Sequence, residues 1–248
     1  MTGAEWFRCF TPLPEAEVQL VCFPHAGGSA SAYFPLARTL SPEVEVRAVQ
    51  YPGRQERRFE PLIGDITELA DRIHAVLDRR PVRRLAFFGH SMGAVVAFEV
   101  ARRIERHGGP PLDALFVSGR RAPSHRRPET ISLRGDDEAS VLAELLSLSG
   151  TDARILQDAE LRELILPVVR GDYAAIEGYD YIPGPPLNCP VTVLTGDADP
   201  LTTVDEARDW ANHTRGGSEL TVFPGGHFFL DAHRPAVARL VEKRLAVG

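Results

Sequence analysis

The chain has 248 residues, 44% of them hydrophobic and 25% charged, with a formal net charge of −6 at pH 7. These proportions are typical of a globular protein, and the length fits one large domain as well as two small ones. The acidic balance argues against a general nucleic-acid-binding protein. Three scattered cysteines form neither a disulfide framework nor a zinc motif. The sequence contains neither a membrane-spanning apolar run nor a signal peptide, so we expect a cytoplasmic protein with no membrane contact.

Six short apolar segments along the chain have the length of β-strands. Several are almost continuous in Val, Leu and Phe, which indicates strands that are covered on both faces. Segments with helical spacing lie between or after them, at 66–79, 94–108 and 236–246. The alternation predicts an α/β fold with a mostly parallel sheet flanked by helices. The predicted strands are Val18–Phe23, Val44–Val49, Arg84–Gly89, Ala114–Gly119, Pro190–Gly196 and Glu219–Gly225.

The alternation of strands and helices is interrupted at about residues 121–188, where no convincing strand occurs. Two segments there, 138–150 and 159–179, have apolar residues at helical spacing. The insertion is too long for an ordinary crossover, so we interpret it as a helical lid. The alternative is that these helices thicken one face of the core. We therefore predict a single domain over residues 1–248, with a lid insertion at about 121–188.

A candidate nucleophile lies in the segment FFGHSMGA, where Gly89 to Gly93 match the pattern G-x-S-x-G around Ser91. The pattern alone occurs by chance in many proteins. Here it falls between a predicted buried strand and a predicted helix, which is the position of the nucleophile elbow in an α/β-hydrolase fold. The glycines allow a sharp turn, and the following helix N-terminus favours developing negative charge.

A serine needs an oriented base, and in this fold the acid and then the histidine follow the serine along the chain. His227 follows the last predicted strand, in PGGHFFL, and is the candidate base. The preceding strand ends in LTGDADP, which offers Asp197 and Asp199. We favour Asp199, because it has the usual spacing from Gly196 and because the proline after it disfavours helical backbone. Asp197 could instead bond the turn backbone.

The same fold stabilises the reaction's oxyanion with two backbone N–H groups. One belongs to the residue after the nucleophile, Met92, and the other to a loop after an early strand. The segment CFPHAGGSA is that loop, and we favour the N–H of Ala26 as the second donor. A glycine-rich turn without a ligand is the alternative. A phosphate-binding loop is disfavoured because neither of its glycine patterns is present.

With these residues in place, the chain resembles the type II thioesterases, the stand-alone editing hydrolases of polyketide and nonribosomal peptide assembly lines. The resemblance rests, in order, on FPHAGGSASAYFPLARTL, VQYPGRQERR, FFGHSMGA, LPVVRGDYAAIEGY, LTGDADP and FPGGHFFL. It implies hydrolysis of acyl thioesters on the phosphopantetheine arm of acyl or peptidyl carrier proteins, which clears stalled or misprimed units in antibiotic biosynthesis.

In that chemistry Ser91 attacks the thioester carbonyl, His227 is the base, Asp199 orients the imidazole, and the Met92 and Ala26 amides stabilise the oxyanion. No metal or cofactor is needed.

Two other functions remain open from the residues alone. The same triad serves general carboxylesterases and acyltransferases, and a hydrolase fold can persist as a non-catalytic interaction subunit. A further hypothesis concerns docking, because two arginine-rich stretches could attract an acidic carrier protein, although such runs are more often solvated surface. These arginines are Arg54, Arg57, Arg58, Arg120, Arg121, Arg126 and Arg127.

Overall fold

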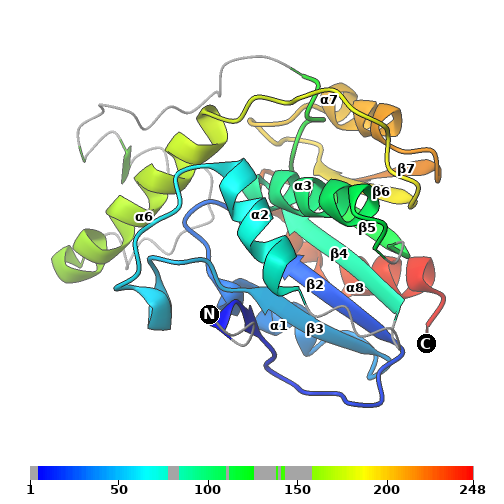
Figure 1. Cartoon of the computed structure of the whole chain (residues 1–248), viewed down its shortest axis with the longest axis horizontal. Helices are drawn as coiled ribbons and strands as arrows, with labels where there is room; N and C mark the ends of the chain where they lie inside the picture. The colour runs from blue at the N-terminus through cyan, green and yellow to red at the C-terminus, as the bar shows by residue number, and fades with distance from the viewer. Residues whose placement is uncertain are drawn as a thin grey trace.

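The computed structural model describes residues 5–77, 84–109, 112–125, 138, 141–142 and 158–247. Within these ranges, seven strands form one sheet in the order β1-β3-β2-β4-β5-β6-β7 (Figure 1). Neighbouring strands are parallel, except that β1 runs antiparallel to β3. The strands are β1 (Phe7–Arg8), β2 (Val18–Phe23), β3 (Val44–Val49), β4 (Arg84–His90), β5 (Ala114–Ser118), β6 (Val191–Gly196) and β7 (Ser218–Phe223).

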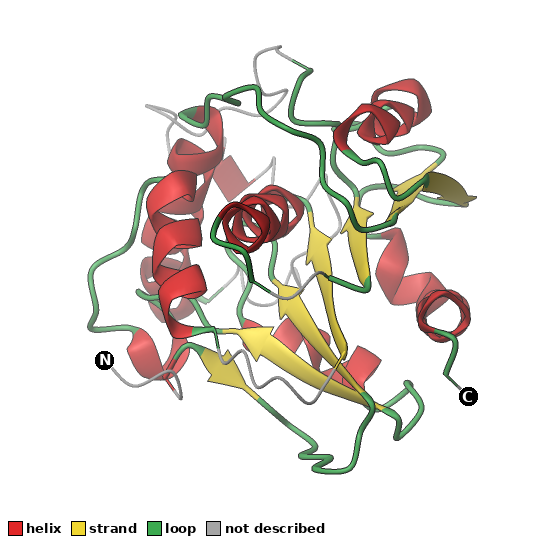
Figure 2. Cartoon of the chain, turned by 45° about the vertical axis from the view of Figure 1, so that its right-hand side comes forward, coloured by secondary structure: helices red, strands yellow, loops and turns green. Residues whose placement is uncertain are grey.

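Helices cover both faces of the sheet (Figure 2). The helices α2 (Ile66–Val76) and α3 (Met92–Arg106) pack on one face and contribute to the larger buried apolar cluster. On the other face, α1 (Phe34–Ala37) and α8 (Phe229–Leu245) pack over the second cluster. Every residue of β5 and β6 is buried, as strands covered on both sides require. The predicted α/β fold with a mostly parallel sheet is confirmed.

The six predicted strands are all present, but the sequence analysis missed several short elements. They lack a periodic pattern long enough to detect. The C-terminal helix was predicted to begin at residue 236, whereas α8 begins at Phe229. His233 has non-helical backbone angles (φ −111°, ψ 18°), and this kink lets Pro235 stand near the start of the second helical segment, where a proline is tolerated. The missed elements are β1, α1, α7 (Val204–Arg208) and the 3₁₀ turns η2 (Ala30–Tyr33), η3 (Gln55–Arg57) and η4 (Asp209–His213).

The second helical segment of the predicted lid is present as α6 (Ala159–Glu177). Its N-terminus is capped by Asp158, whose carboxylate accepts hydrogen bonds from the Glu160 and Leu161 N–H groups at 3.0 and 3.2 Å. α6 lies at the side of the molecule away from the C-terminus (Figure 1). The first segment, 138–150, lies outside the described residues except for positions 138, 141 and 142. The lid function of this insertion stays a prediction.

Candidate active site

Ser91 occupies a sharply turned backbone between β4 and α3. Its φ of 54° and ψ of −120° lie in a region that L-residues rarely adopt. The turn needs residues without side chains, because neighbouring backbone comes very close. A Cβ at Gly93 would lie 2.0 Å from the Phe23 carbonyl oxygen, and one at Gly89 would lie 2.3 Å from the Gly93 oxygen. Both glycines of the G-x-S-x-G pattern are therefore required by the packing, as a nucleophile elbow demands.

The structure brings Asp199, rather than Asp197, against the candidate base. The Asp199 Oδ2 lies 2.9 Å from His227 Nδ1, and both side chains are at most 3% exposed. The other oxygen of Asp199 accepts a hydrogen bond from the Leu201 N–H at 2.8 Å. Asp197 is exposed, and its Oδ1 accepts from the Gly225 N–H at 2.9 Å. The carboxylate of Asp199 can hold the imidazole in one orientation, which leaves its Nε2 as the nitrogen that could take a proton.

The Ser91 side chain is not hydrogen-bonded to that imidazole. Its hydroxyl makes no hydrogen bond to any residue that the structure describes. Its neighbour His90 lies close to the pair, with ring centroids of His90 and His227 5.0 Å apart. Catalytic hydrogen bonds are often long before substrate binds. The structure therefore brings the candidate acid and the candidate base into contact, and places the candidate nucleophile on the turn between β4 and α3.

The two proposed oxyanion donors come from elements that meet at this turn. Met92 is the first residue of α3, so its N–H has no partner within the helix. Ala26 lies in a turn closed by a hydrogen bond from the Gly28 N–H to the His25 carbonyl at 2.9 Å. The Ala26 N–H donates to no residue in the described part of the chain. Both N–H groups are thus available to a ligand.

Two further histidines flank His227, and both are held neutral at physiological pH. Burial lowers the pKa of His25 from 6.5 to about 4, and the charges of His227 and Arg54 act in the same direction. Burial and the neighbouring His227 and His25 also hold the pKa of His90 well below 6.5. The Nδ1 of His90 lies 3.0 Å from the Ser118 hydroxyl. These rings surround the base with apolar and neutral contacts, and sequence analysis gave neither a role.

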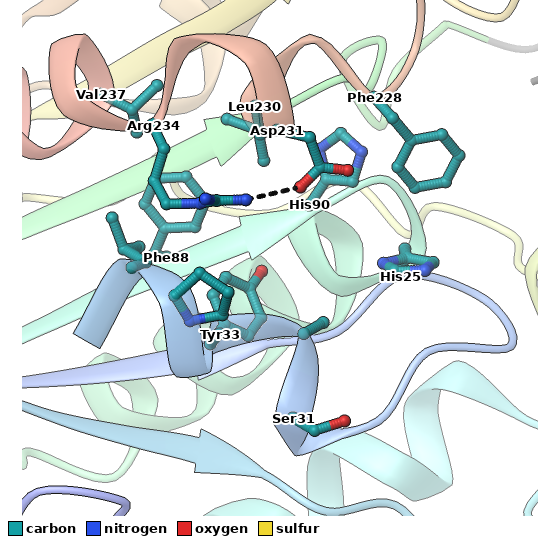
Figure 3. Close-up of a pocket in the computed structure, with 13 residues that line it drawn as sticks. His25, Ser31, Tyr33, Phe88, His90, Phe228, Leu230, Asp231, Arg234 and Val237 are labelled. Carbon is teal, nitrogen blue, oxygen red and sulfur yellow. Dashed lines mark hydrogen bonds and ion pairs between the residues drawn. The ribbon is translucent and has the colours of Figure 1, made fainter. Parts of the chain in front are cut away.

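A cavity of about 300 Å³ adjoins this histidine cluster on the α1 and α8 face (Figure 3). His25, His90 and Phe228 border it, and an ion pair between Asp231 and Arg234 of α8, 3.4 Å long, lies beside it. Among the described residues that line this cavity, none is Ser91, Asp199 or His227. The cavity is therefore adjacent to the candidate catalytic groups but separate from them.

Three arginines of the two arginine-rich stretches are buried, so the hypothesis that these stretches attract a carrier protein is wrong for them. Arg54, Arg57 and Arg121 are only 7%, 4% and 4% exposed. Arg54 is instead bound to Asp172 of α6, a residue that sequence analysis did not single out. The two residues are 118 positions apart, so no local spacing could have joined them. Arg126 and Arg127 lie outside the described residues.

Comparisons with known proteins identify the family. A model of the thioesterase domain matches residues 18–245. The chain belongs to the thioesterase domain family. It is 50% identical over 236 residues to the probable cadicidin biosynthesis thioesterase of Streptomyces griseus, a match that covers 95% of this chain and 64% of that protein. It is also 50% identical over 229 residues to thioesterase PikA5 of Streptomyces venezuelae, covering 91% of this chain and 80% of the relative.

Solved structures agree with this thioesterase assignment. The type II thioesterase BorB from the borrelidin biosynthetic cluster has a TM-score of 0.89 and 48% identity, with 97% of this chain and 98% of BorB covered. RedJ, a thioesterase of the prodiginine pathway in Streptomyces coelicolor, has a TM-score of 0.84 and 35% identity, with 94% and 87% covered. The predicted resemblance to type II thioesterases, the α/β-hydrolase fold class and the prediction of an enzyme acting on thioesters are confirmed.

The structure also bears on whether this thioesterase has a metal site or a membrane-spanning helix. In the described residues, no three His, Cys, Asp or Glu side chains stand together in a way that could hold a metal ion. Among the helices that the structure describes, none is long and apolar enough to cross a bilayer.

The close backbone contact at Gly93 gives a stability prediction. We expect Gly93→Ala to lower the free energy of unfolding by about 1–3 kcal/mol, because its methyl group has no room beside the Phe23 carbonyl. Gly64→Ala is the matched control, since a Cβ at Gly64 would meet nothing within 4 Å. Urea unfolding of both variants measures the difference. Equal stability of the two variants would show that the turn relaxes freely.

The partly buried imidazole of His25 makes stability depend on pH. Its pKa is lowered from 6.5 to about 4 in the folded protein, so between these values the unfolded chain binds a proton that the folded protein does not. Stability should therefore fall as pH is lowered, with His25 alone accounting for about 1 kcal/mol between pH 7 and 5.5. Denaturant unfolding at both pH values should show this loss reduced in His25→Gln. The exposed His107→Gln variant should retain the wild-type loss.

Proposed function

We propose that this thioesterase hydrolyses acyl thioesters on the phosphopantetheine arm of acyl or peptidyl carrier proteins. The observation that carries the proposal is the buried 2.9 Å contact between Asp199 and His227, next to the strained turn of Ser91. The relatives named above support the substrate class, because one is a probable cadicidin biosynthesis thioesterase and another is a type II thioesterase from the borrelidin biosynthetic cluster. Hydrolysis of such thioesters would remove stalled or misprimed acyl units from an assembly line.

The first half of the proposed reaction acylates Ser91. His227 Nε2 takes the proton from the Ser91 hydroxyl as the oxygen attacks the thioester carbonyl carbon. Negative charge then develops on the carbonyl oxygen, which the Met92 and Ala26 N–H groups would stabilise at the positive end of α3. When the carbon–sulfur bond breaks, the leaving sulfur takes the proton from His227, and the acyl group remains on Ser91.

The second half of the proposed reaction repeats these steps with water in place of the Ser91 hydroxyl. Water attacks the acyl-serine carbonyl, gives its proton to His227, and a second tetrahedral intermediate forms at the same donors. Collapse of this intermediate returns the proton to Ser91 and releases the carboxylic acid. The buried carboxylate of Asp199 stabilises the imidazolium formed in each half and keeps its ring in place.

The two aspartates after β6 provide a matched test of the acid. We expect Asp199→Asn to lower kcat by about 10³–10⁴-fold, because the amide would hold His227 in the wrong tautomer. Asp197→Asn should change kcat less than about threefold, since its side chain can still accept from the Gly225 N–H. Steady-state hydrolysis of a small acyl thioester measures both.

The nucleophile has its own test. Ser91→Ala should remove the acyl-enzyme seen by mass spectrometry, and unaltered turnover in that variant would refute the assignment of Ser91.

Substrate class is tested by presenting one acyl group in three forms. The same acyl chain is attached to a carrier protein, to N-acetylcysteamine and to an oxygen ester. We expect kcat/KM to be highest for the carrier, by at least about tenfold over the small thioester, which corresponds to 1.4 kcal/mol of added contact. Equal rates on the oxygen ester would indicate a general esterase. Transfer of the acyl group to an added alcohol or amine would indicate an acyltransferase.

A further inference from the structure

A buried ion pair joins α6 of the predicted lid to the loop after β3. Arg54, in the loop after β3, and Asp172, in α6, have side chains only 7% and 3% exposed. The contact is bidentate, with Arg54 Nη1 2.5 Å from Asp172 Oδ2 and Arg54 Nη2 2.8 Å from Asp172 Oδ1. A two-bond arginine–carboxylate contact fixes relative orientation as well as distance. The pair therefore defines where α6 stands relative to the β3 loop.

Both members of the pair also bind the backbone of the loop between β2 and η2. Asp172 Oδ2 accepts a hydrogen bond from the Gly27 N–H at 2.8 Å, and Arg54 Nη1 donates to the Gly28 carbonyl at 3.2 Å. These two groups immediately follow Ala26. Gly27 has a φ of +75°, and a Cβ there would lie 2.7 Å from Val169 Cγ2 of the same helix. The loop thus follows the surface of α6 closely at this point.

Other side chains fix the same loop on both sides of Ala26. The hydroxyl of Tyr33 donates to the Phe23 carbonyl at 2.8 Å, and that of Tyr51 donates to the Pro24 carbonyl at 3.2 Å. Further along, the Ala30 N–H donates to the side chain of Gln50 at 3.1 Å. The loop is therefore held at its base by tyrosines and after Ala26 by the ion pair.

We propose that Arg54 and Asp172 are positioning residues for the oxyanion hole, acting by fixing the peptide of Ala26 through Gly27 and Gly28. The inference rests on the proposed function, in which the Ala26 N–H stabilises the tetrahedral oxyanion. An oxyanion donor contributes only when it is already aimed at the charge that develops. Because Asp172 lies on α6, a helix of the predicted lid holds the loop that contains Ala26 in place.

The kinetic test uses Asp172→Asn, which preserves shape but removes the charge and one acceptor oxygen. We expect kcat on a small acyl thioester to fall about 10–100-fold, somewhat less than the loss of an entire oxyanion donor. KM should change less than about threefold, because the donor acts mainly in the transition state. The affinity for an alkyl boronic acid, which forms a tetrahedral anion on serine, should fall by the same factor as kcat.

A second variant separates positioning from stability. Arg54→Met combined with Asp172→Leu replaces a buried ion pair by apolar side chains, a change that is often neutral for stability. It should unfold near the wild-type midpoint and still lose kcat and boronic acid affinity. If Asp172→Asn fails to fold, this double variant decides the question. The control is Arg103→Met, which breaks the ion pairs of Arg103 with Glu99 and Asp71, and Arg103 makes no hydrogen bond to the described residues of the loop. It should lose stability and keep kcat.

Three results would overturn the proposal. They are a wild-type kcat in the double variant, a rise in KM alone, and a loss of kcat that only follows the unfolded fraction. The rate of Ser91 labelling by a fluorophosphonate, which also depends on the oxyanion donors, separates this proposal from the proposed function. Labelling of the wild-type enzyme without thioester hydrolysis would refute the proposed function. The labelling rate of the double variant would still test the ion pair, because a rate equal to that of the wild-type enzyme would refute positioning.

Discussion

The close approach of the β2 carboxyl end to the N-terminus of α3 is the constraint on which the candidate site depends. A side chain at Gly93 would lie 2.0 Å from the Phe23 carbonyl oxygen, so only glycine permits this contact. Ser91, two residues before Gly93, has a positive φ of 54° in this turn. The approach also brings the loop that follows Phe23 beside the first turn of α3. One packing contact therefore places the candidate nucleophile and the loop carrying Ala26, the candidate second oxyanion donor, at the same edge of the sheet.

The electrostatics of the site follow from burial more than from net charge. His25 and His90 pack around the candidate base, and burial lowers the pKa of both, so that neither adds a positive charge beside His227 at neutral pH. In the described part of the chain, one buried carboxylate, that of Asp199, pairs with the imidazole. In the proposed reaction, Asp199 would therefore be the oriented partner that stabilises the imidazolium of His227.

Sequence alone was enough to predict those features in which the local structure requires one type of residue. The strand-to-helix turn requires Gly89 and Gly93, and near-continuous apolar runs identify strands buried on both faces. The fold class and all six main strands followed from such signals. The preference for Asp199 over Asp197 also agrees with the contact to His227, because Pro200 and loop spacing are local. Short elements such as β1 and α7 have too few residues for a period to appear.

What the sequence could not reveal is the pairing of groups that are distant along the chain. Arg54 belongs to a run of arginines that resembles a solvated surface, and Asp172 is one carboxylate on an otherwise ordinary helix. Folding removes both from water, which would be costly for either charge alone, and the cost is offset because each satisfies the other and the loop backbone. An apolar pair of similar volume could provide comparable stability, but it would offer no donor or acceptor to Gly27 and Gly28. The physical reason for charged residues at these positions is therefore that their hydrogen bonds are directional. The bidentate contact fixes Arg54 relative to α6, and both side chains hold the peptide groups beside Ala26.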